Sequence, residues 1–143
     1  MKSFPFEYTT AIDIRFADLD AYGHVNNAVY FTYLEHARVK MFQEYFGAFL
    51  DSSLLFLVVR AECDYRLPIT LNEQLQITIK VEQLRHSSFT FNYLLHDGGA
   101  REYATAKTVM VGYDPKAKKP AALPAEIRQT FARLDQPGVV SSV

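Results

Sequence analysis

The 143-residue sequence has a single cysteine, Cys63, and no tryptophan. One cysteine excludes an internal disulfide and any metal site built from several cysteines. The 15 lysines and arginines are balanced by 16 aspartates and glutamates, so no basic excess exists to neutralise the phosphates of nucleic acid. The composition therefore gives no support to a disulfide scaffold or a nucleic-acid-binding protein.

Several other features are also missing. No apolar run is long enough to span a bilayer, and residues 1–6 lack the apolar stretch of a signal peptide, so we expect a cytoplasmic protein with no membrane partner. The glycine-rich fingerprints that bind nucleotide phosphates do not occur. His36, His86 and His96 fall on different expected elements and lack the spacing of metal ligands, so no metal is expected.

The periodicity of apolar residues is typical of one globular domain that covers residues 1–143, with a frayed tail from about Gln136. A long helical pattern runs from about Asn27 to Phe46 and stops at Gly47. A short helix is expected from Pro124 to Leu134, after a solvated loop at 115–120. Alternation predicts strands at 7–16, 54–66, 73–84, 88–96 and 100–113, with a tight turn at 97–99.

This order, one strand, one long helix and then four strands, predicts an α+β fold in which an antiparallel sheet covers the helix. On a helical wheel the polar residues of the helix occupy one narrow arc, namely Thr32, His36, Lys40, Gln43 and Glu44. The rest of its circumference is apolar apart from Glu35 and Arg38, so a partner subunit or a second layer is expected to cover what one sheet cannot. Glu35 and Arg38 have the spacing of a pair, which we expect to be structural.

The most informative segment runs from Asp18 to Tyr30 and contains two acids and a glycine turn directly before the long helix. A carboxylate would then lie beside the unpaired backbone N–H groups of a helix N-terminus. Such a carboxylate can attack a carbonyl or activate water, while the N–H groups stabilise the negative charge that develops on oxygen. The alternative is that the acids only cap the turn or the helix.

The motif Arg15–Asp20, followed by Gly23–Asn27 and then by Tyr30, Glu35 and Arg38, resembles the hot-dog-fold acyl-CoA thioesterases, in particular the 4-hydroxybenzoyl-CoA thioesterase-like branch. The resemblance covers nearly the whole chain, including the closing strand at 106–114. It implies a curved sheet of five or six antiparallel strands wrapped around one central helix. It also implies a homodimer with a continuous sheet, which often assembles further into a homotetramer.

The resemblance implies hydrolysis of a fatty or aromatic acyl thioester of coenzyme A or acyl carrier protein, with no cofactor beyond the coenzyme A of the substrate. Asp20 is then the catalytic general base or nucleophile, and the backbone N–H at Asn27 polarises the carbonyl. His24 either contacts the site or shapes the loop, and Asp18 holds the loop through backbone groups. In some relatives a helix glutamate does the chemistry, which would make Glu35 the rival of Asp20.

Substrate contacts are expected at Gly23 and Tyr30, and at a strand break made of Arg85, His86, Ser87 and Ser88. In the family this break lies near the path of the pantetheine and the phosphates, although it also fits an ordinary hairpin corner. Two other functions stay open: a hot-dog hydratase or dehydratase, and a noncatalytic subunit that only binds acyl thioesters.

Overall fold

A computed structural model describes residues 4–47 and 54–132 of the chain. Its elements follow the predicted order of strand, long helix, four strands and short helix. The predicted tail from residue 136 and the end of the short helix at residue 134 lie outside the described residues. The elements are β1 (Glu7–Ala11), the 3-10 helix η1 (Phe16–Asp18), α1 (Val29–Phe46), β2 (Leu55–Tyr65), β3 (Gln76–Leu84), β4 (Ser88–His96), β5 (Glu102–Asp114), β6 (Lys119–Pro120) and α2 (Ala125–Ala132).

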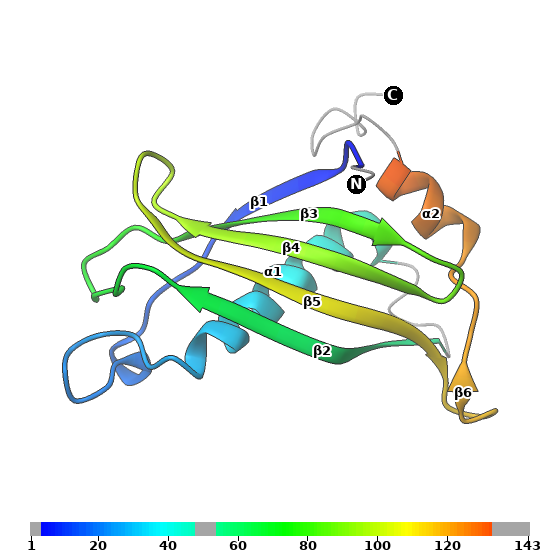
Figure 1. Cartoon of the computed structure of the whole chain (residues 1–143), viewed down its shortest axis with the longest axis horizontal. Helices are drawn as coiled ribbons and strands as arrows, with labels where there is room; N and C mark the ends of the chain where they lie inside the picture. Colours follow the sequence, from blue (N-terminus) through cyan, green and yellow to red (C-terminus); the bar gives the residue numbers. More distant parts are fainter. Residues whose placement is uncertain (1–3, 48–53, 133–143) are drawn as a thin grey trace.

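The strands form one six-stranded antiparallel sheet in the order β1-β3-β4-β5-β2, with β6 paired to the end of β5. The long helix α1 runs along one face of this sheet (Figure 1). This arrangement confirms the predicted α+β fold. Because β2 ends the strand order, its outer edge has no strand partner within the described residues.

The core lies between α1 and the sheet. Alternate residues of β3, among them Ile77 and Ile79, point into the core and are fully buried, as expected for a strand with one wet face. The short helix α2 closes one end of the core with Phe131. This ring packs against four other phenylalanines at centroid distances of 5.2 to 5.7 Å, namely Phe6, Phe46, Phe89 and Phe91.

The five polar residues of the predicted arc of α1 are all exposed, which confirms the wheel. Two apolar residues outside that arc are exposed as well: Phe31 at 36% and Val39 at 46%. The expected pair of Glu35 and Arg38 is not formed, because no ion pair among the described residues joins them. Arg38 instead donates to the hydroxyl of Tyr93 on β4 at 3.2 Å, and Glu35 is exposed.

Several predicted bounds were wrong, among them the start of β3, which lies at Gln76 rather than residue 73. The first strand ends at Ala11 rather than residue 16, because its pairing with β3 stops at the Ala11–Gln76 register position. The helix begins at Val29 rather than Asn27, and Lys119–Pro120 of the expected loop pairs with β5. The predicted turn at 97–99 is present, with Gly98 at a φ of 86°. None of the described helices is long and apolar enough to cross a membrane.

Candidate functional site

Asp20 shapes the turn that carries it. One carboxylate oxygen, Oδ1, accepts hydrogen bonds from the backbone N–H groups of Tyr22 at 2.9 Å and His24 at 3.2 Å. The backbone N–H of Asp20 also donates to the carbonyl of His24 at 2.7 Å. The second oxygen, Oδ2, accepts no hydrogen bond from any described residue. Asp20 therefore has the capping role that the alternative interpretation predicted, and it also keeps one oxygen available for chemistry.

Gly23 closes this turn with a φ of 78°, a left-handed conformation that residues with a Cβ adopt at a cost. No other part of the described chain lies within 4 Å of the position that a Cβ would occupy there. Glycine is therefore required by the backbone conformation, and the space beside it is open to a ligand. The ring of the neighbouring His24 makes no hydrogen bond to the described residues, whereas its backbone pairs with Thr70.

The two asparagines before α1 have different roles. Asn26 accepts a hydrogen bond from the N–H of Ala28 through its side chain at 3.0 Å, and from the N–H of Val29 through its carbonyl at 2.9 Å. These bonds explain why the helix begins two residues later than predicted. The N–H of Asn27 has no acceptor among the described residues. It is therefore available to a ligand, and the role expected for Asn27 stays a prediction.

Tyr65, at the end of β2, contacts two predicted site residues, and the sequence did not identify it. Its hydroxyl donates to the carbonyl of Asn27 at 2.8 Å, and its ring meets Tyr30 edge to face at a centroid distance of 4.7 Å. Burial raises the pKa of Tyr30 to about 12, helped by nearby Cys63, Tyr65 and Asp20, so its hydroxyl stays a donor at neutral pH. The sequence could assign Tyr65 only to a strand. It could not reveal the contact with Asn27, because 38 residues separate the two.

Cys63 lies on β2 close to this aromatic pair. Burial raises the pKa of its thiol to about 11, so the thiol is protonated at neutral pH and is a poor nucleophile. The described residues contain no group of three or more histidine, cysteine, aspartate or glutamate side chains that could hold a metal ion. The described groups at this site are a carboxylate and hydrogen-bond donors.

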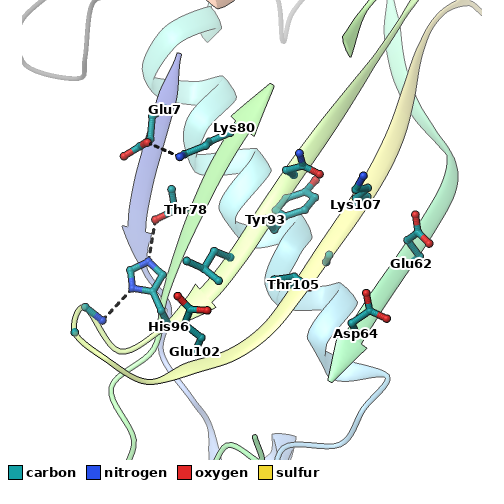
Figure 2. A pocket seen from close by; sticks show the side chains of 15 residues that line it. Glu7, Glu62, Asp64, Thr78, Lys80, Tyr93, His96, Glu102, Thr105 and Lys107 are labelled. Carbon is teal, nitrogen blue, oxygen red and sulfur yellow. Dashed lines mark hydrogen bonds and ion pairs between the residues drawn. The ribbon is translucent and has the colours of Figure 1, made fainter. Parts of the chain in front are cut away.

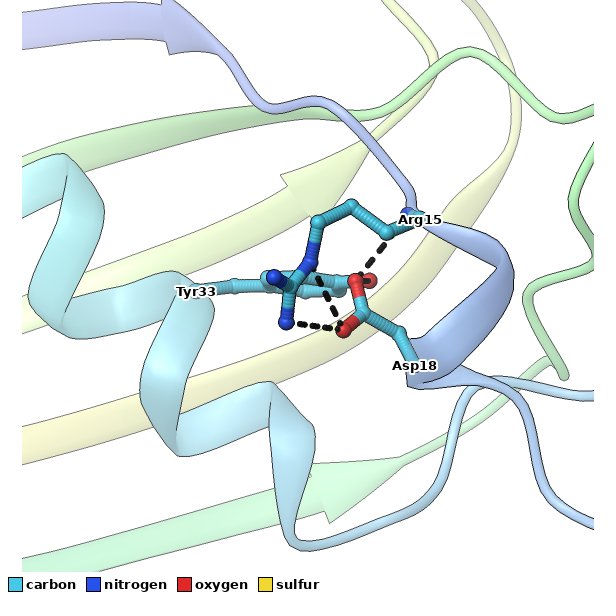
Figure 3. Close-up of polar contacts among 3 residues, drawn as sticks. All are labelled: Arg15, Asp18 and Tyr33. Carbon is cyan, nitrogen blue, oxygen red and sulfur yellow. Dashed lines mark hydrogen bonds and ion pairs between the residues drawn. The ribbon is translucent and has the colours of Figure 1, made fainter.

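The side chain of Asp18 is more buried than that of Asp20 and accepts more hydrogen bonds. Its side chain is 3% exposed, and its two oxygens accept the hydroxyl of Tyr33 at 2.7 Å, the backbone N–H of Arg15 at 3.0 Å, and the Arg15 guanidinium at 3.0 and 3.2 Å. Figure 3 shows the carboxylate between these two residues. Burial alone would raise the pKa of Asp18, but the bonds from Tyr33 and Arg15 outweigh it and lower the pKa. Asp18 thus holds the loop as predicted, but mainly through the side chains of Arg15 and Tyr33 rather than through backbone groups.

Of the predicted substrate-binding residues 85–88, the first three form the corner between β3 and β4, and Ser88 begins β4. Their carbonyls bind the C-terminal part of the chain: Gly112 donates to Ser87, Leu123 to His86 and the Arg128 guanidinium to Arg85. Within one chain this corner and the Asp20 loop lie at opposite ends of the sheet (Figure 1). The structure of a single chain therefore brings Asp20, Asn27 and Tyr30 into one region and leaves Arg85, His86, Ser87 and Ser88 far from it.

Hollows lie on both faces of the sheet. A groove of about 420 Å³ lies between α1 and the start of β2, lined by Glu35, Arg38, Val39, Phe42, Leu54, Leu55, Phe56, Leu57, Val58 and Met110. A larger hollow of about 830 Å³ lies on the opposite face of the sheet, where Lys80 pairs with Glu7 and Thr78 meets His96 (Figure 2). Neither hollow is lined by a predicted catalytic or substrate-binding residue, and the groove is the one that lies beside α1, the helix that follows the Asp20 loop.

The chain resembles known proteins over most of its length. Residues 14–131 match the family model of the thioesterase-like superfamily. The long-chain acyl-CoA thioesterase FadM of Escherichia coli is 31% identical over 128 residues, which cover 87% of this chain and 97% of that protein.

Solved structures agree. A thioesterase from Thermus thermophilus, complexed with coenzyme A and zinc, is 34% identical with a TM-score of 0.77, covering 87% of this chain and 97% of its own. The PA5185 protein of Pseudomonas aeruginosa is 30% identical with a TM-score of 0.81, covering 92% and 93%. The chain therefore belongs to the thioesterase-like superfamily and has the hot-dog fold of its members.

Proposed function

We propose that the protein hydrolyses an acyl thioester of coenzyme A to the free acid and the thiol, with Asp20 as the catalytic carboxylate. The family makes the chain a thioester hydrolase, and relatives named as acyl-CoA thioesterases support an acyl-CoA substrate. The single observation that supports the catalytic role of Asp20 is that its two carboxylate oxygens differ in their contacts. Oδ1 is held by two backbone N–H groups, while Oδ2 has no partner among the described residues.

The chemistry needs one carboxylate and one donor. As a nucleophile, Oδ2 attacks the carbonyl carbon, the C–S bond breaks with its electron pair going to sulfur, and water then hydrolyses the resulting mixed anhydride. As a general base, Oδ2 instead takes a proton from water while the oxygen of that water attacks the same carbon. In both routes the N–H of Asn27 stabilises the negative charge on the carbonyl oxygen. His24 orients the water, and the Tyr30 hydroxyl donates to the substrate.

The groove beside α1 suits the acyl group. Phe31, Glu35, Arg38 and Phe42 follow one another at helical spacing on the same face of α1, so this face leads from the first turn of the helix into the groove. The far end is closed by Phe42 and Phe56, whose rings stack at 5.5 Å. The path from Phe31 to Phe42 is ~16 Å long at the rise of an α-helix, which fits an acyl chain of medium length.

A second copy of the chain would bring the corner at residues 85–88 to the same substrate. The edge strand β2 exposes Leu55, Leu57, Val58 and Val59, and an uncovered apolar edge is a ready site for strand pairing. A twofold axis through this edge makes the two β2 strands antiparallel. The Tyr65 end of one copy then lies beside the Leu55 end of the other, where Leu55 pairs with Tyr113 next to Gly112 and its Ser87 contact.

In this dimer each site combines Asp20, Asn27 and Tyr30 of one copy with residues 85–88 of the other. Arg85 and His86 are exposed and have side-chain donors for the phosphates of coenzyme A. The pairing also covers Phe31 and Val39, the apolar residues of α1 that one chain leaves exposed. This explains why the two predicted parts of the site are far apart within one chain.

The test is release of free thiol from a panel of coenzyme A thioesters of short, medium and long fatty acids and of aromatic acids. We expect steady turnover of at least one member, with medium chains preferred. Tight binding of the thioesters without any thiol release would overturn the hydrolase and favour a noncatalytic binding subunit. Addition of water to an unsaturated acyl-CoA, with the thioester left intact, would favour a hydratase.

A further inference from the structure

The loop that carries Asp20 is attached to α1 through the carboxylate of Asp18. Tyr33, in the second turn of α1, donates to Oδ2 of Asp18 at 2.7 Å, and the Arg15 guanidinium donates to Oδ1 from the chain before the loop. Asp18 also closes the neck of the loop, because its carbonyl accepts the N–H of Asn26 at 2.9 Å. Asp18 therefore joins the chain before the loop and the helix through its carboxylate, and the end of the loop through its backbone carbonyl.

We propose that Tyr33 and Arg15 are positioning residues, which act through Asp18 to hold the Asp20 carboxylate and the Asn27 N–H in their reactive arrangement. The inference rests on the proposed role of Asp20. It goes beyond that role because neither Tyr33 nor Arg15 belongs to the predicted site. Asp20 follows the neck by two residues, and Asn27 is the residue directly after Asn26, so a shift of the neck moves both groups.

The geometry distinguishes a positioning role of Tyr33 and Arg15 from a general contribution to the stability of the fold. The loop has a second attachment directly before Asn26, where the N–H of Val25 donates to the carbonyl of Ile69 at 2.8 Å. Loss of the Tyr33 hydroxyl leaves that attachment and the buried ring in place, so the chain stays folded while the neck loses its tie to the helix. A displacement of about 1 Å at a reacting group is enough to lower a rate by about 100-fold.

The chain offers a matched control for Tyr33. Tyr8 is 2% exposed, belongs to the same buried core, and donates its hydroxyl to the carboxylate of Glu44 at 2.9 Å near the other end of α1. Tyr8→Phe removes the same kind of bond, from a buried tyrosine to a carboxylate, at a place remote from Asp20. Any effect of lost packing or lost stability alone is therefore shared by the two variants.

The experiment compares kcat and KM for thiol release by the wild type, Tyr33→Phe, Arg15→Met and Tyr8→Phe. We expect Tyr33→Phe to lower kcat by roughly 10- to 100-fold, with KM within about twofold, because the acyl and coenzyme A contacts are untouched. Arg15→Met is expected to lower kcat less, since Arg15 is largely exposed. Tyr8→Phe is expected to keep the kcat of the wild type. Equal kcat values for Tyr33→Phe and Tyr8→Phe would overturn the inference.

Amide hydrogen exchange gives a readout that does not depend on activity. In Tyr33→Phe the amides of Asp20, His24 and Asn26 are expected to exchange at least about tenfold faster than in Tyr8→Phe. If neither the wild type nor any variant releases thiol, the proposed function fails. Faster exchange of these three amides in Tyr33→Phe would still establish that Tyr33 holds the neck of the loop to α1 through Asp18. Unchanged exchange in Tyr33→Phe contradicts the tie, whatever the activity.

Discussion

Asp18 and Asp20 are separated by a single residue in the sequence, but their surroundings in the structure are opposite. Asp18 is buried and accepts four hydrogen bonds, whereas Asp20 keeps one oxygen without a partner among the described residues. The sequence indicated this division, because acids two apart in an irregular loop need not face the same way. It could not identify Tyr33 as the partner of Asp18, since a contact over 15 residues depends on the path of the loop between them.

The lowered pKa of Asp18 makes stability depend on pH in a definite direction. A carboxylate whose pKa is lowered by folding stabilises the native state above its unfolded pKa of about 4, and this contribution is lost as the pH falls through the lower native pKa. At neutral pH we expect Asp18→Asn to lower the free energy of unfolding by about 2 kcal/mol, the value of a hydrogen-bonded buried charge. Urea unfolding at several pH values measures this difference.

The same series contains its own control. As the pH falls from about 4 through the lower native pKa of Asp18, the unfolded state and then the native state take up a proton, so the stability gap to Asp18→Asn is expected to narrow. A gap that stays constant from neutral to acidic pH would show that Asp18 contributes packing rather than a charge.

At the scale of elements, each predicted end of a helix or strand was right or wrong for a physical reason. The strand at 88–96 was predicted correctly because its apolar and polar faces alternate along most of its length. The first strand was predicted too long, since alternation continues past Ala11 whereas the partner strand does not. The helix start was missed because the asparagine that takes up the Ala28 N–H is Asn26, and side-chain identity alone does not say which of two adjacent asparagines does so.

The arrangement of α1 and β2 makes a prediction about acyl length. Phe42 and Phe56 stack in the lining of the groove, and Phe56 is only partly buried, so Phe56→Ala should lengthen the groove without unfolding the chain. Each buried methylene is worth about 0.8 kcal/mol, so room for two more methylenes should raise kcat/KM for longer acyl-CoA substrates about tenfold relative to the wild type. Thiol release over a chain-length series measures the shift.

A control on the other face of the sheet isolates the groove. Val111 of β5 alternates with the buried Met110 and therefore points away from α1, so Val111→Ala removes apolar volume without touching the groove. Its chain-length preference should equal that of the wild type. If Phe56→Ala and Val111→Ala share one preference, the stack does not limit the acyl chain.

At the scale of the whole molecule, the parts of the predicted site lie at opposite ends of one chain, and the edge strand β2 is apolar and uncovered by described residues (Figure 1). The sequence indicated a partner subunit, because most of the circumference of the helix is apolar. It could not indicate which edge the partner would use, because the position of β2 at the end of the sheet follows from the order in which the strands pair.

Mixed dimers test whether two copies share each site. Asp20→Asn removes the carboxylate, and Arg85→Glu reverses a charge at the corner predicted to bind coenzyme A. Alone, each variant should have low kcat/KM. After the two are unfolded and refolded together in equal amounts, half of the dimers are mixed and each has one intact site, so about a quarter of the wild-type activity should return.

The outcome distinguishes the two arrangements. If each site were built from one chain only, every site in a mixed dimer would lack either the catalytic carboxylate or the positive charge at the corner, and no activity would return. A sizing column on the wild type complements this test, because a stable monomer would leave the apolar edge of β2 unexplained.

The measurement closest to the central claim is thiol release by Asp20→Asn on the best acyl-CoA of the panel. The substitution preserves an oxygen that can accept the Tyr22 and His24 N–H groups, so the turn and substrate binding should persist. Our account predicts a loss in kcat of at least ~100-fold with KM nearly unchanged, as for removal of a general base or nucleophile. Full turnover by Asp20→Asn would contradict it and would move the search for the catalytic carboxylate to Glu35.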